Sequence, residues 1–541
     1  MIQLLYLYSF FIGLLSSLIL IPLLVKYASK LGLVDNPVGS LRKLHKAPMP
    51  RSGGLGIIIP TAIAILVILP WSDAILSFLV SSLVIVGFGL LDDVMELKPA
   101  QKLIGQTLGV CLAMVGGMVI STVPFIDDAP IWMSYALTFV FVMAVINGVN
   151  FSDGMDGLAA GTTLMALVVI FLLAVASNNA QVAIIAASIC AALVGFLRFN
   201  THPATIFMGD AGSQFLGFSV AWLAITLSQA EASTLTPLLP LLILGIPIMD
   251  VLQVVCVRVK KKLPLPGPDK EHFHHQIAKL GLTQASVVAT VYILQLILLF
   301  GAFLVKHDTD TTAFGFYVFY LAGVLGLLYL AHMQGWTVGG AKAFEGHNRR
   351  NGVFRRVSAL HPYSGKFYGA VTAGLLWVFA VISTGMPKGL IYIALIVAIS
   401  IVSLRLIAKG RWTLLIARVS TYTASTFCVY GMTLSLGPQD LFGIFDLFLI
   451  SLTILLAISI RTTRKKYFWL TPQDLLVLFF VILLAPSLSL DLGPGVNAGA
   501  LVYKTILLLY LCEYVLARGY LAQKRLTTAA LFSLFLLSIN L

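Results

Sequence analysis

Charged residues are scarce in this chain. Asp, Glu, Lys and Arg make up only 11% of the 541 residues, and the mean hydropathy is +0.98. In soluble domains roughly a quarter of the residues are charged. The composition therefore excludes an ordinary soluble protein and predicts an all-α, polytopic membrane helical bundle.

Cysteine is also rare. The five cysteines all lie within long apolar runs, at Cys111, Cys190, Cys256, Cys428 and Cys512. Their spacing shows no pairs, which argues against a disulfide framework and against a metal site built on thiolates. We interpret them as small packing residues.

Apolar runs that could cross a membrane recur along the whole chain and predict about 18 transmembrane helices. They lie near 3–25, 55–70, 74–91, 103–120, 131–146, 158–177, 181–197, 213–230, 235–257, 286–306, 314–333, 367–386, 389–408, 416–436, 442–460, 473–490, 500–517 and 526–541. No basic residue precedes the first run, whereas Lys26 and Lys30 follow it. We therefore expect an anchor with its N-terminus outside, and not a cleaved signal peptide.

The basic residues are unevenly distributed among the predicted loops. With the N-terminus outside, all of the 35 Lys and Arg residues except Lys306, Lys388 and Lys504 fall on the cytoplasmic side, as the positive-inside rule requires. The net charge of +13 is thus mostly a topology signal. It suits membrane lipid and anionic substrates as partners, and it implies no nucleic acid.

The segment 147–161, with the sequence NGVNFSDGMDGLAAG, carries two asparagines and two carboxylates between apolar runs. Such groups are costly at a membrane boundary unless they bind something, so we interpret the segment as a substrate-binding loop. If a helix begins here, Asp153 and Asp156 share one face of its first turn. A helix cap is the simpler alternative, although a cap needs only one such side chain.

Two further loops place carboxylates at the predicted inner boundary. Asp92 and Asp93 end the third run, where adjacent charges that repel one another favour a nearby cation or metal. Asp210 opens the eighth run between Gly209 and Gly212, three residues after Phe207. Mg²⁺ prefers oxygen ligands, typically one or two carboxylates with phosphate oxygens and water, so Asp210 is a candidate metal ligand.

Histidines and basic residues complete the set. The first inner loop holds His45 and Arg51 near two glycines. This loop either binds an anion or only fixes the orientation of the first membrane helix through its positive charge. The fifth inner loop holds His272, His274 and His275. Zinc is an alternative for them, but zinc sites usually use separated ligand pairs and often Cys. We prefer the histidines as hydrogen-bond donors to phosphates or a sugar.

Together these five loops, in this order, resemble the polyprenyl-phosphate N-acetylhexosamine-1-phosphate transferases, of glycosyltransferase family 4 type. That superfamily also holds phospho-N-acetylmuramoyl-pentapeptide translocase. The likeness covers about the first 335 residues. The run from Asp92-Asp93 through Lys102 to Gly105-Gln106, and the sequence His-Phe-His-His, are similar to the bacterial branch that uses UDP-GlcNAc.

The resemblance implies a role for each motif. Asp210 would bind Mg²⁺, with Mn²⁺ as an alternative, and Phe207 would stack on uracil. Asp92 and Asp93 would be the essential pair near the lipid phosphate. The nucleotide pocket would be formed by Asn150, Asp153 and Asp156. Other substrate contacts would be made by His45, Arg51 and Lys102. The diphosphate sugar would be contacted by His272, His274 and His275, of which His274 is counted with the catalytic residues.

The implied reaction moves a sugar 1-phosphate, GlcNAc 1-phosphate first, from a UDP-sugar to undecaprenyl phosphate at the cytoplasmic face of a bacterial plasma (inner) membrane. Direct attack by the lipid phosphate is favoured because this phosphate is largely ionised at neutral pH. A route through a covalent aspartyl phosphate is the alternative. A muramoyl-pentapeptide donor and an ion-coupled transporter are the alternatives, although transporters place such residues near the midplane.

We expect three regions. Residues 1–335 form a transferase core with about 11 of the spans, 336–366 form a basic cytoplasmic loop, and 367–541 form an appended transmembrane module for scaffolding or partner binding. Few ionisable residues lie within the later spans, which argues against an ion pathway there. A homodimer is left open.

Overall fold

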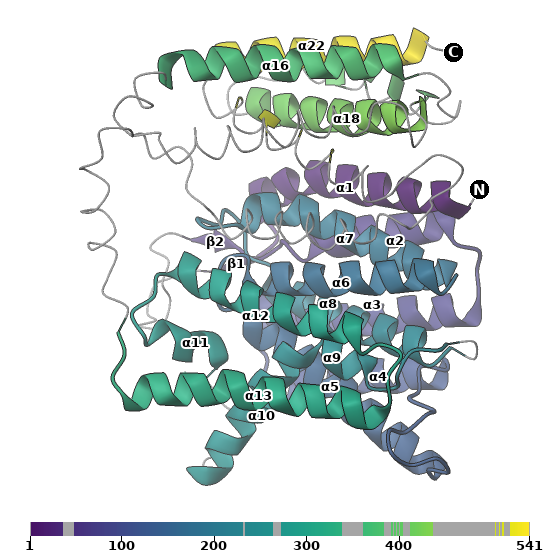
Figure 1. The fold of residues 1–541 in the computed structure, drawn as a ribbon, viewed down its shortest axis with the longest axis vertical. Coiled ribbons are helices and arrows are strands. Elements are labelled where there is room, and N and C mark those ends of the chain that lie inside the picture. Colours follow the sequence, from purple (N-terminus) through teal and green to yellow (C-terminus); the bar gives the residue numbers. More distant parts are fainter. Residues whose placement is uncertain are drawn as a thin grey trace. The chain divides into compact units, whose positions relative to one another are not determined.

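The computed structural model describes residues 2–35, 48–230, 233–262, 272–337, 361–383, 412–435 and 520–539, with scattered positions from 391 to 403 and from 504 to 515. The chain divides into two compact units, and the division in the sequence lies between Ala343 and Phe344. Figure 1 shows that the described part is built almost entirely of helices.

The helices of the first unit are α1 Ile2–Tyr27, α2 Leu55–Ile68, α3 Asp73–Met95, α4 Pro99–Val115, α5 Ile131–Ser152, α6 Leu158–Ala176, α7 Ala180–Asn200, α8 Gly209–Ser228, α9 Leu239–Ile243, α10 Gly245–Lys260, α11 Phe273–Ala278, α12 Gln284–Leu304 and α13 Asp310–Met333. Two short strands, β1 Val34–Asp35 and β2 Met49–Pro50, pair antiparallel. The described helices of the second unit that are continuous are α16 His361–Ile382, α18 Trp412–Ser435 and α22 Tyr520–Ile539.

Eight helices of the described residues are long and apolar enough to cross a membrane. They are α1, α3, α5, α6, α7, α8, α12 and α13. This confirms the prediction of an all-α membrane protein. The predicted count of about 18 spans is not confirmed. Within the described residues α2 and α4 have only 14 and 17 residues, and the ninth run is broken. The runs 442–460 and 473–490 and parts of their neighbours lie outside the described residues.

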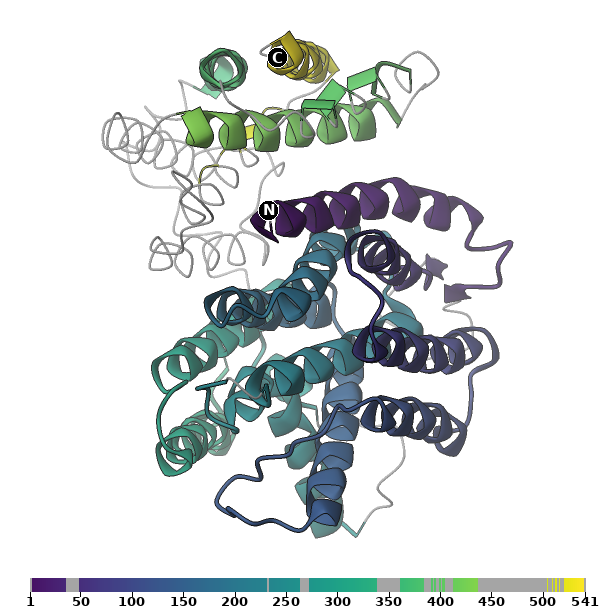
Figure 2. The same cartoon turned by 90° about the vertical axis from the view of Figure 1, so that its right-hand side faces the viewer.

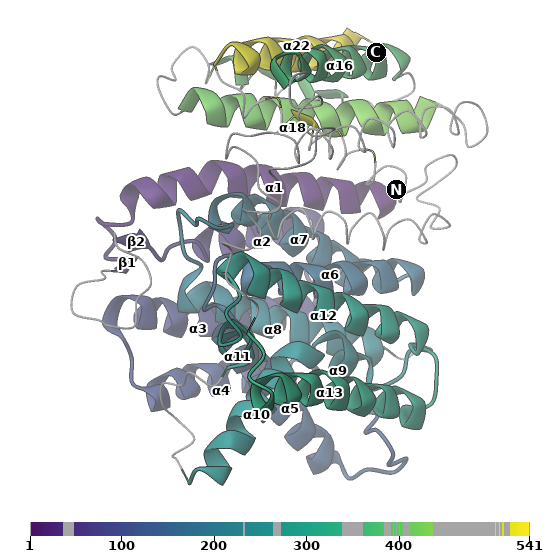
Figure 3. The ribbon, with the colours of Figure 1, turned by 60° about the vertical axis from the view of Figure 1, so that its left-hand side comes forward.

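Helices α6, α7 and α8 form the core of the first unit. Most of each helix is buried, with 89%, 83% and 94% of the residues of their most apolar stretches inside the protein. These helices are apolar on all sides, as buried helices are. Helices α1 and α13 lie at opposite sides of the unit, with α6, α7 and α12 between them (Figures 1 and 3).

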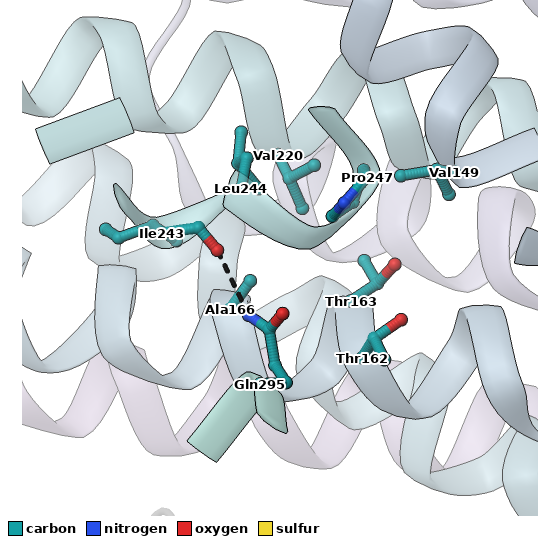
Figure 4. Close-up of a pocket in the computed structure, with 9 residues that line it drawn as sticks. All are labelled: Val149, Thr162, Thr163, Ala166, Val220, Ile243, Leu244, Pro247 and Gln295. Carbon is teal, nitrogen blue, oxygen red and sulfur yellow. Dashed lines mark hydrogen bonds between the residues drawn. The ribbon is translucent and has the colours of Figure 1, made fainter. Parts of the chain in front are cut away.

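The predicted ninth span, 235–257, is broken into α9 and α10 at Leu244. Proline explains the break, since Pro247 has no N–H to donate to the carbonyl of Ile243, four residues earlier. The amide of Gln295 on α12 supplies the missing donor, at 3.1 Å from that carbonyl (Figure 4). Thr162 and Thr163 of α6 line the same small cavity. Side chains thus satisfy backbone that the break leaves unpaired, as the hydrocarbon core requires.

Candidate active site

The C-terminal turn of α3 meets the N-terminal turn of α8 through Asp93. Its two carboxylate oxygens accept hydrogen bonds from the backbone N–H groups of Asp210, at 2.8 Å, and Ala211, at 3.1 Å. The start of a helix leaves N–H groups without partners and carries positive partial charge. Asp93, buried at the end of one helix, is therefore the cap of another and fixes the position of Asp210.

Gly209 makes this junction possible. Its φ is +77°, a conformation that residues with a Cβ rarely adopt. A Cβ atom at this position would also lie 2.5 Å from the carbonyl oxygen of Arg51 and 2.7 Å from an oxygen of Asp93. The glycine before the predicted metal ligand is thus required by close packing of three segments.

Asp92 and Asp210 converge on one cation. The Lys102 ammonium, from the first turns of α4, donates to an Asp210 oxygen at 2.9 Å and pairs with an Asp92 oxygen. The other oxygen of Asp92 accepts the N–H of Leu97 at 2.8 Å. Two carboxylates share a single positive charge here, so the cluster keeps a net negative charge where the ends of three helices meet.

These carboxylates fit the ligand preference of Mg²⁺ in part. Among the described residues, no group of three His, Cys, Asp or Glu side chains is arranged to hold a metal. Mg²⁺ bound with a phosphorylated substrate needs only one or two carboxylates, because phosphate oxygens and water supply the rest. Asp210 and Asp92, which already face a shared cation, form such a donor pair.

The loop between α5 and α6 holds the two other carboxylates. Helix α5 continues to Ser152 and α6 begins only at Leu158, so Asp153 and Asp156 do not share the first turn of a helix as one expectation had it. Residues 153–157 form turns, in which Gly157 has a φ of +78°.

The two aspartates of this loop have different surroundings. Burial, and then the negative charges of Asp210, Asp93 and Asp156, raise the pKa of Asp153 well above its ordinary value, while Arg51 lowers it. Asp156 instead accepts hydrogen bonds at one oxygen from His202, at 2.7 Å, and from the N–H of Ala204, at 3.1 Å. Asp153 thus belongs to the carboxylate cluster, and Asp156 holds the loop that precedes α8.

Asn150 links α5 to α8. Its carbonyl oxygen accepts a hydrogen bond from the Ser213 hydroxyl at 2.6 Å. One turn earlier, Asn147 donates to Gln106 at 2.9 Å, and Gln106 donates to Gln214 at 3.2 Å. This chain of amides joins α5, α4 and α8, which hold the cluster in place.

The histidines pack beside the same loop. An added Cβ at Gly154 would lie 2.8 Å from Nε2 of His274, so the bare backbone of the loop allows this contact. The His274 ring lies 4.2 Å from the ring of His275, and the His272 ring lies 4.7 Å from that of Phe151. The fifth inner loop therefore reaches the segment 151–154 of the third inner loop.

His274 is buried and neutral. Burial, and then the neighbouring His275, lower its pKa to about 3. Its Nε2 atom has no hydrogen-bonding partner among the described residues, and a buried polar atom without a partner is uncommon in folded proteins. A neutral imidazole next to the carboxylate loop can donate or accept one hydrogen bond to a substrate.

Asp250 is the residue that sequence reasoning missed. It is buried on α10, where one oxygen lies 3.1 Å from Nδ1 of His272 and the other accepts the N–H of Phe273 at 2.7 Å. It thereby anchors the start of α11 and the ring of His272. The signal was available, because a carboxylate inside an apolar run is a functional candidate by default.

The first inner loop joins the fourth at the cluster. The carbonyl of Pro50 accepts the N–H of Phe207 at 2.7 Å, and the carbonyl of Phe207 accepts the N–H of Gly53 at 3.0 Å. Arg51 pairs with the buried Asp35 at 3.1 Å, a partner that the sequence did not indicate. Phe207 is half-buried. His45 lies outside the described residues.

The predicted site residues that the structure describes therefore gather from five loops at one end of the bundle. Asp92, Asp93, Lys102, Asp153 and Asp210 form one charged cluster. The remaining residues adjoin it through hydrogen bonds, backbone pairing or ring contacts, and are Arg51, Asn150, Asp156, Phe207, His272, His274 and His275. Their chemical roles stay predictions.

Comparison with known proteins agrees with the order of these motifs. A sequence model described as glycosyl transferase family 4 matches residues 75–228. The chain is also 34% identical over 307 residues to a protein of Bacillus subtilis (strain 168) named probable undecaprenyl-phosphate N-acetylglucosaminyl 1-phosphate transferase, and the match covers 56% of this chain and 85% of that protein. The chain belongs to glycosyl transferase family 4.

Other relatives of this glycosyl transferase family 4 chain are similar over three quarters or more of their own length. A decaprenyl-phosphate N-acetylglucosaminephosphotransferase of Mycobacterium tuberculosis (strain ATCC 25618 / H37Rv) is 32% identical over 347 residues, which is 56% of this chain and 83% of the relative. An undecaprenyl-phosphate alpha-N-acetylglucosaminyl 1-phosphate transferase of Escherichia coli (strain K12) is 29% identical over 279 residues, with 49% and 75% covered.

Proposed function

We propose that this protein transfers an N-acetylhexosamine 1-phosphate, GlcNAc 1-phosphate first, from a UDP-sugar to undecaprenyl phosphate. UMP is released, and a lipid diphosphate sugar remains in the inner leaflet of a bacterial plasma membrane. The names of the relatives describe GlcNAc 1-phosphate transfer to polyprenyl phosphates, which supports both substrates. Membership of the same family supports an enzyme over the ion-coupled transporter.

One observation carries the proposal within this chain, namely that Asp92 and Asp210 share the Lys102 cation. Asp93 is hydrogen-bonded to the backbone of Asp210, and Asp153 lies near enough for the charges of Asp210 and Asp93 to raise its pKa. Phosphoryl transfer depends chiefly on positioning and on neutralising charge. A cluster with fixed carboxylates and one ammonium at a helix N-terminus suits a diphosphate that arrives with a cation. The boundary location suits one water-soluble and one membrane-bound substrate.

The chemistry assigned to the residues is simple. An oxygen of the lipid phosphate attacks the phosphorus bonded to the sugar, and the bond from that phosphorus to the UMP oxygen breaks. Asp93 has both oxygens bonded to the N–H groups of α8, so we assign it to positioning Asp210. Asp92 and Lys102 then face the phosphates, where Lys102 offsets negative charge.

The histidine side of the site is assigned to the donor. The neutral His274 would hydrogen-bond the diphosphate sugar, with His275 beside it and His272 held by Asp250. Phe207, at the entry to α8, would offer its ring to uracil, and the turn 153–157 would contact the nucleotide. Each of these assignments follows from the family resemblance, and the position of these residues beside the carboxylate cluster supports it.

The donor set also fits a divalent cation. Asp210, with Asp92, would hold Mg²⁺, or Mn²⁺ as the alternative, and the bound ion would neutralise the diphosphate and the leaving UMP. Lys102 would then release one of its two carboxylates to that ion. The assignment makes Asp210 the residue on which cation dependence rests.

The direct experiment uses membranes that contain the full chain, labelled UDP-sugars, undecaprenyl phosphate and Mg²⁺. We expect a butanol-soluble labelled lipid and equimolar UMP, with UDP-GlcNAc as the best donor and no product when the acceptor is omitted. Faster product formation from UDP-MurNAc-pentapeptide would replace the GlcNAc assignment. No lipid product from any UDP-sugar would overturn the proposed function.

A further inference from the structure

The second unit contains a groove between α16 and α22, which lie side by side (Figure 2). Ala373 and Trp377 line it from α16, and Lys524, Arg525, Thr528 and Ala529 line it from α22. Its volume is about 430 Å³, which falls within the range of small-molecule sites. All of these residues belong to one unit, so the groove is defined without reference to the transferase site.

The charge of the groove is positive and unbalanced. Lys524 and Arg525 are both exposed, and neither has an acidic partner within the ranges that the structure describes. None of the lining residues is acidic. An Arg guanidinium matches the geometry of a phosphate group, and Lys adds a point charge. The natural occupant of the groove is therefore an anion with several acceptor oxygens.

The apolar surroundings distinguish a lipid from a soluble anion. The exposed rings of Trp377 and Phe532 lie 5.5 Å apart at the groove. Beyond them along the same helices, Val381 and Phe535 are also exposed, one turn further on in each case. A polar, cationic end thus continues into an apolar surface, with an indole at the join as in membrane interfaces.

We propose that this groove binds the phosphate headgroup of an anionic membrane lipid. The headgroup lies against Lys524 and Arg525, and the acyl or prenyl chain runs along Trp377 and Phe532. This gives the appended module a lipid-binding role that is independent of the proposed transfer reaction. Basic residues that only set the orientation of a membrane helix would account for the charges of Lys524 and Arg525. They would not require a groove or aromatic rings beside those charges.

Lys26 and Lys30 provide a matched pair of cations that do not line this groove. Lys26 lies in the last turn of α1 and Lys30 follows the end of that helix, and each lies over the Tyr27 ring, at 5.1 and 5.7 Å. The test uses the full chain in detergent and counts bound lipids by native mass spectrometry. The probes are phosphatidylglycerol, a polyprenyl monophosphate, phosphatidylcholine and inorganic phosphate.

We expect the double variant Lys524→Ala/Arg525→Ala to bind phosphatidylglycerol about thirtyfold more weakly than the wild type, since each basic residue near a lipid phosphate contributes a similar increment. Each single variant should lose about fivefold. The swapped variant Lys524→Arg/Arg525→Lys and the control Lys26→Ala/Lys30→Ala should bind within about threefold of the wild type. Binding of the polyprenyl phosphate at the groove supports the proposal equally.

Three results of the lipid-binding comparison would overturn the proposal. These are unchanged lipid binding by the double and both single variants, equal loss in the α1 control, and phosphatidylcholine binding as tight as phosphatidylglycerol binding. Displacement of the lipid by millimolar inorganic phosphate would identify a soluble phosphate site and would also overturn it. Thermal unfolding midpoints equal to that of the wild type establish that the variants are folded. If the double variant does not fold, the single variants provide the comparison.

Discussion

Asp93 and Asp92 are adjacent, yet the structure predicts different consequences when each becomes asparagine. Asp93 caps α8 with both oxygens. In Asp93→Asn one carboxylate oxygen becomes an NH₂ group. This group is itself a donor, so the backbone N–H that it faces loses its hydrogen-bond acceptor. A hydrogen bond to a charged group contributes about 1.5–3 kcal/mol, and losing a cap costs about 0.5–2 kcal/mol. We expect Asp93→Asn to lose about 2–3 kcal/mol of stability.

Asp92→Asn is the matched control. Its remaining oxygen can still accept the Leu97 N–H, and Lys102 keeps its bond to Asp210. Because Lys102 is partly exposed, the lost ion pair should cost at most about 1 kcal/mol. Thermal unfolding of the full chain in detergent should therefore give midpoints in the order wild type, Asp92→Asn, Asp93→Asn. Sugar 1-phosphate transfer should fall in both variants. A midpoint of Asp93→Asn at or above that of Asp92→Asn would refute the capping role.

Three further perturbations test the histidine side of the site. Asp250→Asn should raise the KM for the UDP-sugar more than it lowers kcat, because the ring of His272 loses its anchor; unchanged kinetics would contradict this. Gly154→Ala should lower transfer at least about tenfold, since the new methyl group displaces His274, whereas Gly326→Ala, which meets no atom within 4 Å, should not. Folding lowers the pKa of His274 to about 3. Below about pH 6.5 the unfolded chain therefore binds a proton at this residue that the folded chain does not. The free energy of unfolding should consequently fall as the pH is lowered from about 6.5 towards 3. His274→Gln should flatten that part of the stability profile, and an unaltered profile would count against the buried neutral ring.

Much of the arrangement could be predicted from the sequence because membrane burial imposes a simple rule. Long apolar runs become helices, and carboxylates at their ends stand out against them. Asp92, Asp93 and Asp210 were found in this way, and α3 and α8 place them at helix ends as expected. The conditional expectation for Asp153 and Asp156 was wrong, because glycines keep 153–157 in turns.

The rest depends on tertiary contacts that no local pattern contains. The cap that Asp93 provides for α8 joins residues more than a hundred positions apart. The bond from Gln295 to the carbonyl of Ile243 likewise compensates for Pro247 from a distant helix. Composition identified the apolar run 235–257 but not its break. The link between Asp250 and His272 depends on how α10 meets α11, which the sequence alone did not indicate.

The decisive measurement is the Mg²⁺ dependence of lipid product formation by the wild type and by Asp210→Asn, with the exposed Asp128→Asn as the control. We expect saturable Mg²⁺ activation in the wild type and the control, and loss of transfer in Asp210→Asn at every Mg²⁺ concentration with the protein still folded. Near-normal turnover by Asp210→Asn would contradict the assignment of the converged carboxylates to phosphate and cation binding.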